Sequence, residues 1–98
     1  MKIPSYIDLG LIRGVLQLVL VQEISREEAS EWANKVRIGL KEQRMSYFPT
    51  KDERAIWHAI ILVQGIDLMD SPISYLHNTE DLLEWDAKLE NDMANSAS

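Results

Sequence analysis

The chain has 98 residues, of which 46% are hydrophobic and 27% charged, a composition typical of one globular domain. It contains no cysteine, which excludes disulfides and thiolate chemistry, and its net charge of −6 disfavours phosphate backbones as partners. We therefore expect a single helical domain over residues 1–98.

The first predicted helix covers residues 6–21, with Ser5 as its N-cap. Its apolar residues cover more than one face, so we expect other helices to surround it. The apolar run 9–21 is too short to span a bilayer, which predicts a cytoplasmic protein without a membrane segment. Gly10 and Gly14 lower helix propensity, and we expect the close approach of a neighbouring helix to compensate.

The second helix has the clearest start signal, because Ser25 and Glu28 have the spacing of a capping box. Helical spacing of apolar residues continues to Leu40, and we expect the helix to end near Arg44. In the loop that follows, Tyr47 and Phe48 are expected to fold back onto the core.

Thr50 and Glu53 form a second predicted capping box, which starts a third helix over residues 52–64. This helix is the most apolar after the first, and we expect it to be central in the core. Gly65 is typical of the left-handed residue just after a helix end.

Residues 67–78 contain a turn signal at Asp70-Ser71-Pro72, and a final helix is predicted at about residues 80–91. The sequence therefore predicts an all-α, single-domain bundle of four main helices. A short extra helix fits between Gly65 and Asn78, and a short extended segment is the alternative.

The acidic residues are concentrated in the last third of the chain. Residues 67–98 carry eight acidic residues and one lysine, a net charge of −7, whereas residues 1–66 have a net charge of +1. Such a field attracts basic proteins, and an aromatic side chain ringed by carboxylates suits a binding hot spot. The expected partner-binding residues are Asp67, Asp70, Tyr75, His77, Glu80, Asp81 and Glu84. A solubilising acidic helix, with Tyr75 merely closing the core, is the alternative.

Catalytic and metal-binding motifs are absent from the sequence. Its two histidines have no zinc-ligand spacing, and its four glycines do not form a phosphate-binding loop. We therefore expect no metal, no cofactor and no enzymatic activity. An enzyme that uses His77 is the least favoured reading.

Nucleic-acid binding ranks second to protein binding. The second and third helices loosely suggest a helix-turn-helix, but their connection is long. Acidic residues at Glu42, Asp52 and Glu53 dilute the basic residues, so we expect nucleic acid to be an unlikely partner. The basic residues that would form such a surface are Lys35, Arg37, Lys41, Arg44, Lys51 and Arg54.

Three phrases of the sequence, within residues 24–85, carry a family resemblance. They are Ile24-Ser25-Arg26-Glu27-Glu28-Ala29 with Trp32-Ala33, then Trp57-His58-Ala59 with Gly65-Ile66-Asp67-Leu68, and then Tyr75-Leu76-His77 with Glu80-Asp81-Leu82 and Trp85. This set resembles small helical bacterial immunity proteins of contact-dependent inhibition and polymorphic toxin systems. The resemblance implies an acidic cytoplasmic protein that neutralises a cognate toxin, such as a basic nuclease domain, by binding it. A homo-oligomer is compatible with this reading.

Overall fold

The computed structural model describes residues 4–48, 50–72 and 74–96, without the side chains of Asp70 and Ser96. This part of the chain forms four α-helices, which confirms the predicted number of main helices. They are α1 (Leu9–Leu20), α2 (Arg26–Lys41), α3 (Glu53–Gln64) and α4 (Thr79–Ser96). The short elements are β1 (Tyr6–Ile7), β2 (Ser46–Tyr47), the 3₁₀ turn η1 (Thr50–Asp52), β3 (Met69–Ser71) and β4 (Ser74–Tyr75).

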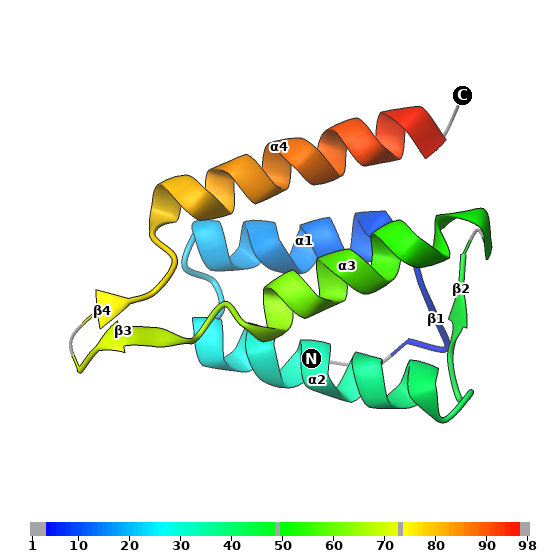
Figure 1. Cartoon of the computed structure of the whole chain (residues 1–98), viewed down its shortest axis with the longest axis horizontal. Coiled ribbons are helices and arrows are strands. Elements are labelled where there is room, and N and C mark those ends of the chain that lie inside the picture. The colour runs from blue at the N-terminus through cyan, green and yellow to red at the C-terminus, as the bar shows by residue number, and fades with distance from the viewer. Residues whose placement is uncertain (1–3, 49, 73, 97–98) are drawn as a thin grey trace.

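Helix α1 lies in the middle of the molecule, between α4 on one side and α2 on the other (Figure 1). Helix α3 packs along α2 and also contacts α1. The expectation that the first helix is surrounded by others is therefore confirmed. The largest fully buried side chains come from all four helices and from the segments between them, and include Ile12, Leu16, Val36, Ile60 and Leu82.

The segment between α3 and α4 contains a β-hairpin, so the predicted extra helix is wrong and the extended alternative is right. Strands β3 and β4 pair antiparallel, with Met69 opposite Tyr75. The hydroxyls of Ser71 and Ser74 lie 3.0 Å apart across the turn. Proline in this segment lacks an amide hydrogen, which disfavours a helix and suits a turn. The hairpin projects from one end of the molecule (Figure 1).

A parallel strand pair includes residues 6–7, so the first helix begins at Leu9 and not at residue 6 as predicted. Strand β1 pairs with β2, and the amide of Phe48 donates to the carbonyl of Ile7 at 2.9 Å. Asp8 is therefore the N-cap of α1, and its Oδ1 accepts from the amide of Leu11 at 2.7 Å, so the predicted Ser5 cap is wrong. Tyr47 packs against the core as expected, but Phe48 is 62% exposed.

The ends of the other helices confirm one prediction and correct four, because α4 continues to Ser96, beyond its predicted end at about residue 91. The Ser25–Glu28 capping box is present in both directions, at 3.0 and 3.2 Å. Helix α2 ends at Lys41 instead of near Arg44, and α3 follows η1 with Asp52 in place of Thr50 as its N-cap. Gly65 has a φ of −90°, so it is not left-handed.

The left-handed residues that end α1 and α2 are both glutamines. Gln22 and Gln43 have φ values of 63° and 62°. After each, the next amide bonds back across the helix end, from Glu23 to Leu18 and from Arg44 to Gly39, both at 2.8 Å. This is the pattern of a Schellman motif, in which the main-chain bonds favour a conformation that glycine would adopt at lower cost.

Gly14 lacks the close neighbour that the sequence suggested, because a Cβ built on it would have nothing within 4 Å. We therefore expect Gly14→Ala to raise the free energy of unfolding by about 1 kcal/mol, the difference in helix propensity between the two residues. Urea denaturation measures the change. Gln17→Gly in the same helix is the reverse control and should lower stability by a similar amount, whereas a loss of stability in Gly14→Ala would contradict the open surroundings of Gly14.

Candidate functional site

The predicted partner-binding residues lie at and beyond the hairpin end of the molecule, but they do not all face one surface. Glu80 and Glu84 are exposed on α4, and Asp67 is half-buried before β3. The side chain of Asp70 lies outside the described residues. The remaining three members, Tyr75, His77 and Asp81, make contacts within the protein.

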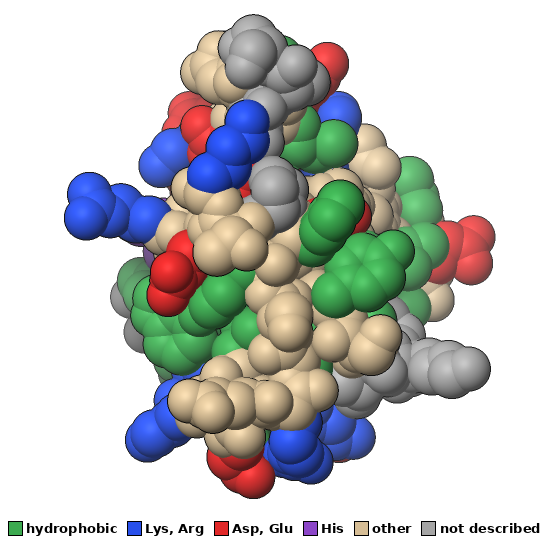
Figure 2. Space-filling model, turned by 90° about the vertical axis from the view of Figure 1, so that its right-hand side faces the viewer, with side chains coloured by type: hydrophobic (Ala, Val, Ile, Leu, Met, Phe, Trp, Pro, Cys, Tyr) green, Lys and Arg blue, Asp and Glu red, His purple; other side chains and the backbone are tan. Residues whose placement is uncertain are grey.

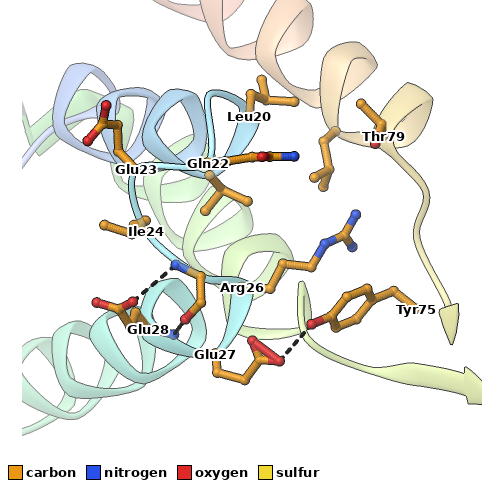
Figure 3. A pocket seen from close by; sticks show the side chains of 12 residues that line it. Leu20, Gln22, Glu23, Ile24, Arg26, Glu27, Glu28, Tyr75 and Thr79 are labelled. Carbon is orange, nitrogen blue, oxygen red and sulfur yellow. Dashed lines mark hydrogen bonds between the residues drawn. The ribbon is translucent and has the colours of Figure 1, made fainter. Parts of the chain in front are cut away.

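Tyr75 holds the hairpin against the start of α2 (Figure 3). Its hydroxyl donates a 2.7 Å hydrogen bond to the Oε1 atom of Glu27, and the guanidinium of Arg26 lies 4.3 Å from the centre of its ring. The hydrogen bond lowers the pKa of Glu27 and raises that of Tyr75. Tyr75 is therefore engaged with α2 and fixes the position of the hairpin.

Removing this hydroxyl tests the origin of the Glu27 shift. Because the bond from Tyr75 is the largest cause of the lowered pKa, Tyr75→Phe should raise the pKa of Glu27 toward its usual 4.5. A lowered pKa stabilises the folded protein above the unfolded-state pKa, and this contribution disappears as the pH falls through the folded-state pKa. Carboxyl-detected NMR titration measures the shift. Tyr47→Phe is the control, and an unchanged Glu27 pKa in Tyr75→Phe would contradict the assignment.

His77 and Asp81 belong to the N-terminal cap of α4. Asp81 accepts from the amide of Asn78 at 3.1 Å, and Asn78 accepts from the amide of Asp81 at 2.9 Å. Nδ1 of His77 lies 3.8 Å from Asp81, and its ring packs edge-on against Trp85, with centroids 4.8 Å apart. These contacts give both residues a structural role at the helix start.

Arg26 links three segments at this end, and sequence analysis did not single it out. Its Nη1 donates to the carbonyls of Ile66 at 3.2 Å and His77 at 2.6 Å. The same side chain covers the Tyr75 ring, as Figure 3 shows. In the sequence, Arg26 follows the N-cap Ser25, which indicates only that a helix begins there. No pattern of neighbouring residues indicated its contacts with Ile66, His77 and Tyr75.

Part of the acidic C-terminal segment also has a structural role. Arg13 of α1 bonds both carboxylate oxygens of Asp86, at 2.8 and 3.3 Å, and reaches Glu90 at 3.2 Å. Asp86 raises the pKa of Arg13 through this hydrogen bond. These acids attach α4 to α1, so the −7 charge counted along the sequence overstates the acidity available to a partner.

A cleft at the opposite end of the molecule, between α2 and α3, brings basic and aromatic side chains together. Its volume is about 670 Å³, and we call it the α2–α3 cleft. It is lined by Arg37, Leu40, Lys41, Tyr47, Glu53, Arg54 and Trp57. Helix α2 brings its last turns to this end and α3 begins there, because β2 and η1 connect them (Figure 1).

Arg37 has an incompletely bonded guanidinium in this cleft. Its Nη2 donates to Oδ1 of Asn34 at 3.2 Å, whereas its buried Nε has no hydrogen-bond partner among the described residues. A buried donor without a partner costs free energy, and an anion or a water molecule can satisfy it. Burial and the carboxylate of Glu53 raise the pKa of Tyr47 in the same cleft.

The other predicted basic residues differ in how they are paired. Lys35 contacts Glu31 at 3.2 Å, and Arg44 contacts Glu42 at 3.4 Å. Within the described part of the chain, Lys41 and Arg54 form no such ion pair. Figure 2 shows Lys and Arg side chains along one side and the lower edge of this end, with separate acidic side chains between them.

Within residues 4–48, 50–72 and 74–96 the structure contains neither a candidate metal site nor a candidate membrane span. No group of three or more His, Cys, Asp or Glu side chains is placed to hold a metal ion. None of the helices is both long and apolar enough to cross a membrane.

Comparison with known proteins identifies the family. Residues 7–89 match the family model of the YxzC DNA-binding protein. The chain is similar to the uncharacterised protein YxzC of Bacillus subtilis (strain 168), with 36% identity over 70 residues, which cover 71% of this chain and 52% of the relative. The chain thus spans about half the length of that relative. No solved structure matches.

These comparisons overturn the predicted identity. Neither match points to an immunity protein of contact-dependent inhibition, so the resemblance to that group and the expected toxin partner are wrong. The family's description also contradicts the expectation that nucleic acid is an unlikely partner. The resemblance had relied on short helical phrases, among them a capping box that marks only a helix start. The chain belongs to the YxzC DNA-binding protein family.

Proposed function

We propose that this protein binds DNA through the α2–α3 cleft, with Arg37, Lys41 and Arg54 contacting phosphates. The observation that carries the proposal is that three cations, Arg37, Lys41 and Arg54, line one cleft, and that Lys41 and Arg54 form no ion pair among the described residues. Arginine and lysine side chains that neutralise DNA phosphates release the counterions condensed on the DNA, and this release supplies most of the affinity of non-specific binding. The description of the family supports the same function.

The distribution of charge supports this end of the molecule as the DNA-facing end. The α2–α3 cleft and the projecting hairpin lie at opposite ends of the long axis (Figure 1). The exposed carboxylates of Glu80 and Glu84 are on the first turns of α4, next to the hairpin. A duplex that contacts the cleft therefore stays away from the acidic end.

The arrangement of α2 and α3 favours binding to the DNA backbone over binding through a helix-turn-helix motif. Helices α2 and α3 run in opposite directions and are joined by β2 and η1, not by a short turn (Figure 1). Phosphate contacts fix the position of a protein on the duplex without reading its sequence. We accordingly propose that the affinity for DNA depends strongly on salt concentration. We also propose that the chain acts in the cytoplasm and that it binds DNA without catalysing a reaction. The proposed absence of catalysis is supported by His77, because its side chain is engaged with Asp81 and Trp85 at the start of α4.

The test compares a cleft variant with a charge-matched control. Arg37→Gln, Lys41→Gln and Arg54→Gln together should weaken binding to a 20-bp duplex by about tenfold or more, and should reduce the slope of log K against log salt by about 3. Fluorescence anisotropy between 50 and 200 mM salt measures both quantities.

The control carries the same change in net charge at exposed positions outside the cleft: Gln17→Glu, Gln22→Glu and Asn91→Glu. It should retain most of the affinity and the salt slope of the original chain. Equal weakening of the two triple variants would show that only net charge matters, and unchanged binding of the cleft variant would exclude the cleft.

A further inference from the structure

A second cleft, between α3 and α4, has a lining that differs from that of the DNA-facing cleft. We call it the α3–α4 groove, and its volume is about 380 Å³, within the range of small-molecule sites. Its lining comprises Lys51, Asp52, Arg54, Ala55, His58, Ala59, Leu62, Trp85, Lys88, Leu89 and Asp92. The groove exists because α4 packs along α1, while α3 packs along α2 and α1.

Small residues on one wall leave room in this groove. Ala55, Ala59 and Leu62 follow helical spacing along α3, so they share one face. Trp85 and Leu89 supply the facing wall from α4. The walls are therefore apolar, and two alanines face an indole, which leaves space for a flat or thin apolar group.

The side chains around the groove have a net positive charge, whereas the whole chain has a net negative charge. Lys51, Arg54 and Lys88 lie at its rim with the exposed His58, against Asp52 and Asp92. The whole chain has a net charge of −6, so a net positive rim is a local reversal. Lys88 forms no ion pair among the described residues and is the one lysine of residues 67–98.

We propose that the α3–α4 groove binds a small organic anion, with an aromatic or branched apolar body between α3 and α4 and its acidic group near Lys88 and Arg54. Apolar walls with a few polar groups at the mouth are the usual composition of a ligand site. The charge at the rim selects an anion over a neutral or cationic ligand. The groove shares Arg54 with the proposed DNA contacts, whereas Lys88 and the apolar walls line the groove alone.

A pair of matched dyes tests the proposal without DNA. 8-Anilinonaphthalene-1-sulfonate carries a sulfonate, and N-phenyl-1-naphthylamine has the same aromatic body without it. The folded chain should bind the sulfonate dye at one site, with an affinity about tenfold higher than that of the neutral dye, as two ion pairs at the rim would give. Fluorescence titration measures affinity, and chemical shift changes in amide NMR spectra locate the dye.

Two variants separate the apolar and ionic parts of the site. Lys88→Gln should weaken the sulfonate dye by about three- to fivefold and leave the neutral dye unchanged. Ala55→Leu fills the groove and should weaken both dyes. Lys35→Gln, on α2 and paired with Glu31, is the control and should change neither.

Three results would overturn the proposal. The first is equal affinity for the two dyes, and the second is the absence of saturable binding up to 1 mM dye. The third is a set of shift changes centred on the exposed apolar residues of the hairpin segment, Leu68, Met69 and Leu76.

Discussion

Leu16→Ala is expected to lower the free energy of unfolding by about 3–4 kcal/mol, the range for a leucine removed from a closely packed core. Leu16 lies on α1, which contacts each of the other three helices, and its side chain is 0% exposed. Truncation removes apolar contacts and leaves a cavity that neighbours on several helices would have to close. Domains of this size have only about 5–15 kcal/mol of total stability, so the loss should be obvious in urea denaturation.

The same helix provides a matched control. Leu11 is 39% exposed, and Leu11→Ala should cost less than about 1 kcal/mol because this surface side chain has fewer packed contacts to lose than Leu16 and leaves no closed cavity. A similar cost for the two substitutions would contradict the central position of α1. The comparison also bears on the sequence-based expectation that residues 52–64 form the central helix, because α1 packs against α2, α3 and α4, whereas the extensive helix packing of α3 is against α2 and α1.

Arg26→Ala is expected to lower the free energy of unfolding by about 2–3 kcal/mol, because two half-buried carbonyl acceptors would lose their charged hydrogen-bond donor. The carbonyls of Ile66 and His77 lose the bonds from Nη1, and Tyr75 loses the cation over its ring. These contacts join the start of α2 to the end of α3 and the start of α4. Thermal and urea unfolding measure the loss, and amide hydrogen exchange in the hairpin should increase with it.

Two controls separate this structural role from DNA binding. Arg26→Lys keeps the charge but not the planar guanidinium, and it should recover only part of the stability. Arg54→Ala, at the other end, should change stability by less than about 0.5 kcal/mol and yet weaken DNA binding. If Arg26→Ala left stability and hairpin exchange unchanged, the contacts of Arg26 would have no structural importance.

The charge pattern along the chain differs from the charge that the fold leaves exposed at the hairpin end. Counting charges along the chain gave a −7 segment, but Asp86 and Glu90 pair with Arg13, more than 70 residues earlier. Asp81 caps its own helix. A count along the sequence cannot separate carboxylates used within the fold from those that face solvent.

The basic residues were identified from the sequence, but their grouping was not. Arg37 and Lys41 were recognised as cations on the second helix, and Arg54 on the third. Their common cleft depends on how α2 and α3 pack and on β1 pairing with β2 across 40 residues of sequence. The same packing buries the Arg37 Nε, which has no hydrogen-bond partner in the described part of the chain, and no residue pattern predicts this.

The sequence alone determined the features that depend on neighbours three or four residues apart. Helical spacing of apolar residues predicted the four helices, and Ser25 with Glu28 predicted the start of α2 to the residue. Only the tertiary structure decided the hairpin, the contacts of Arg26 and the two clefts. These depend on pairs of residues far apart in the chain, and the free energy of such pairs comes from packing and loop closure, which leave no periodic signal in the sequence.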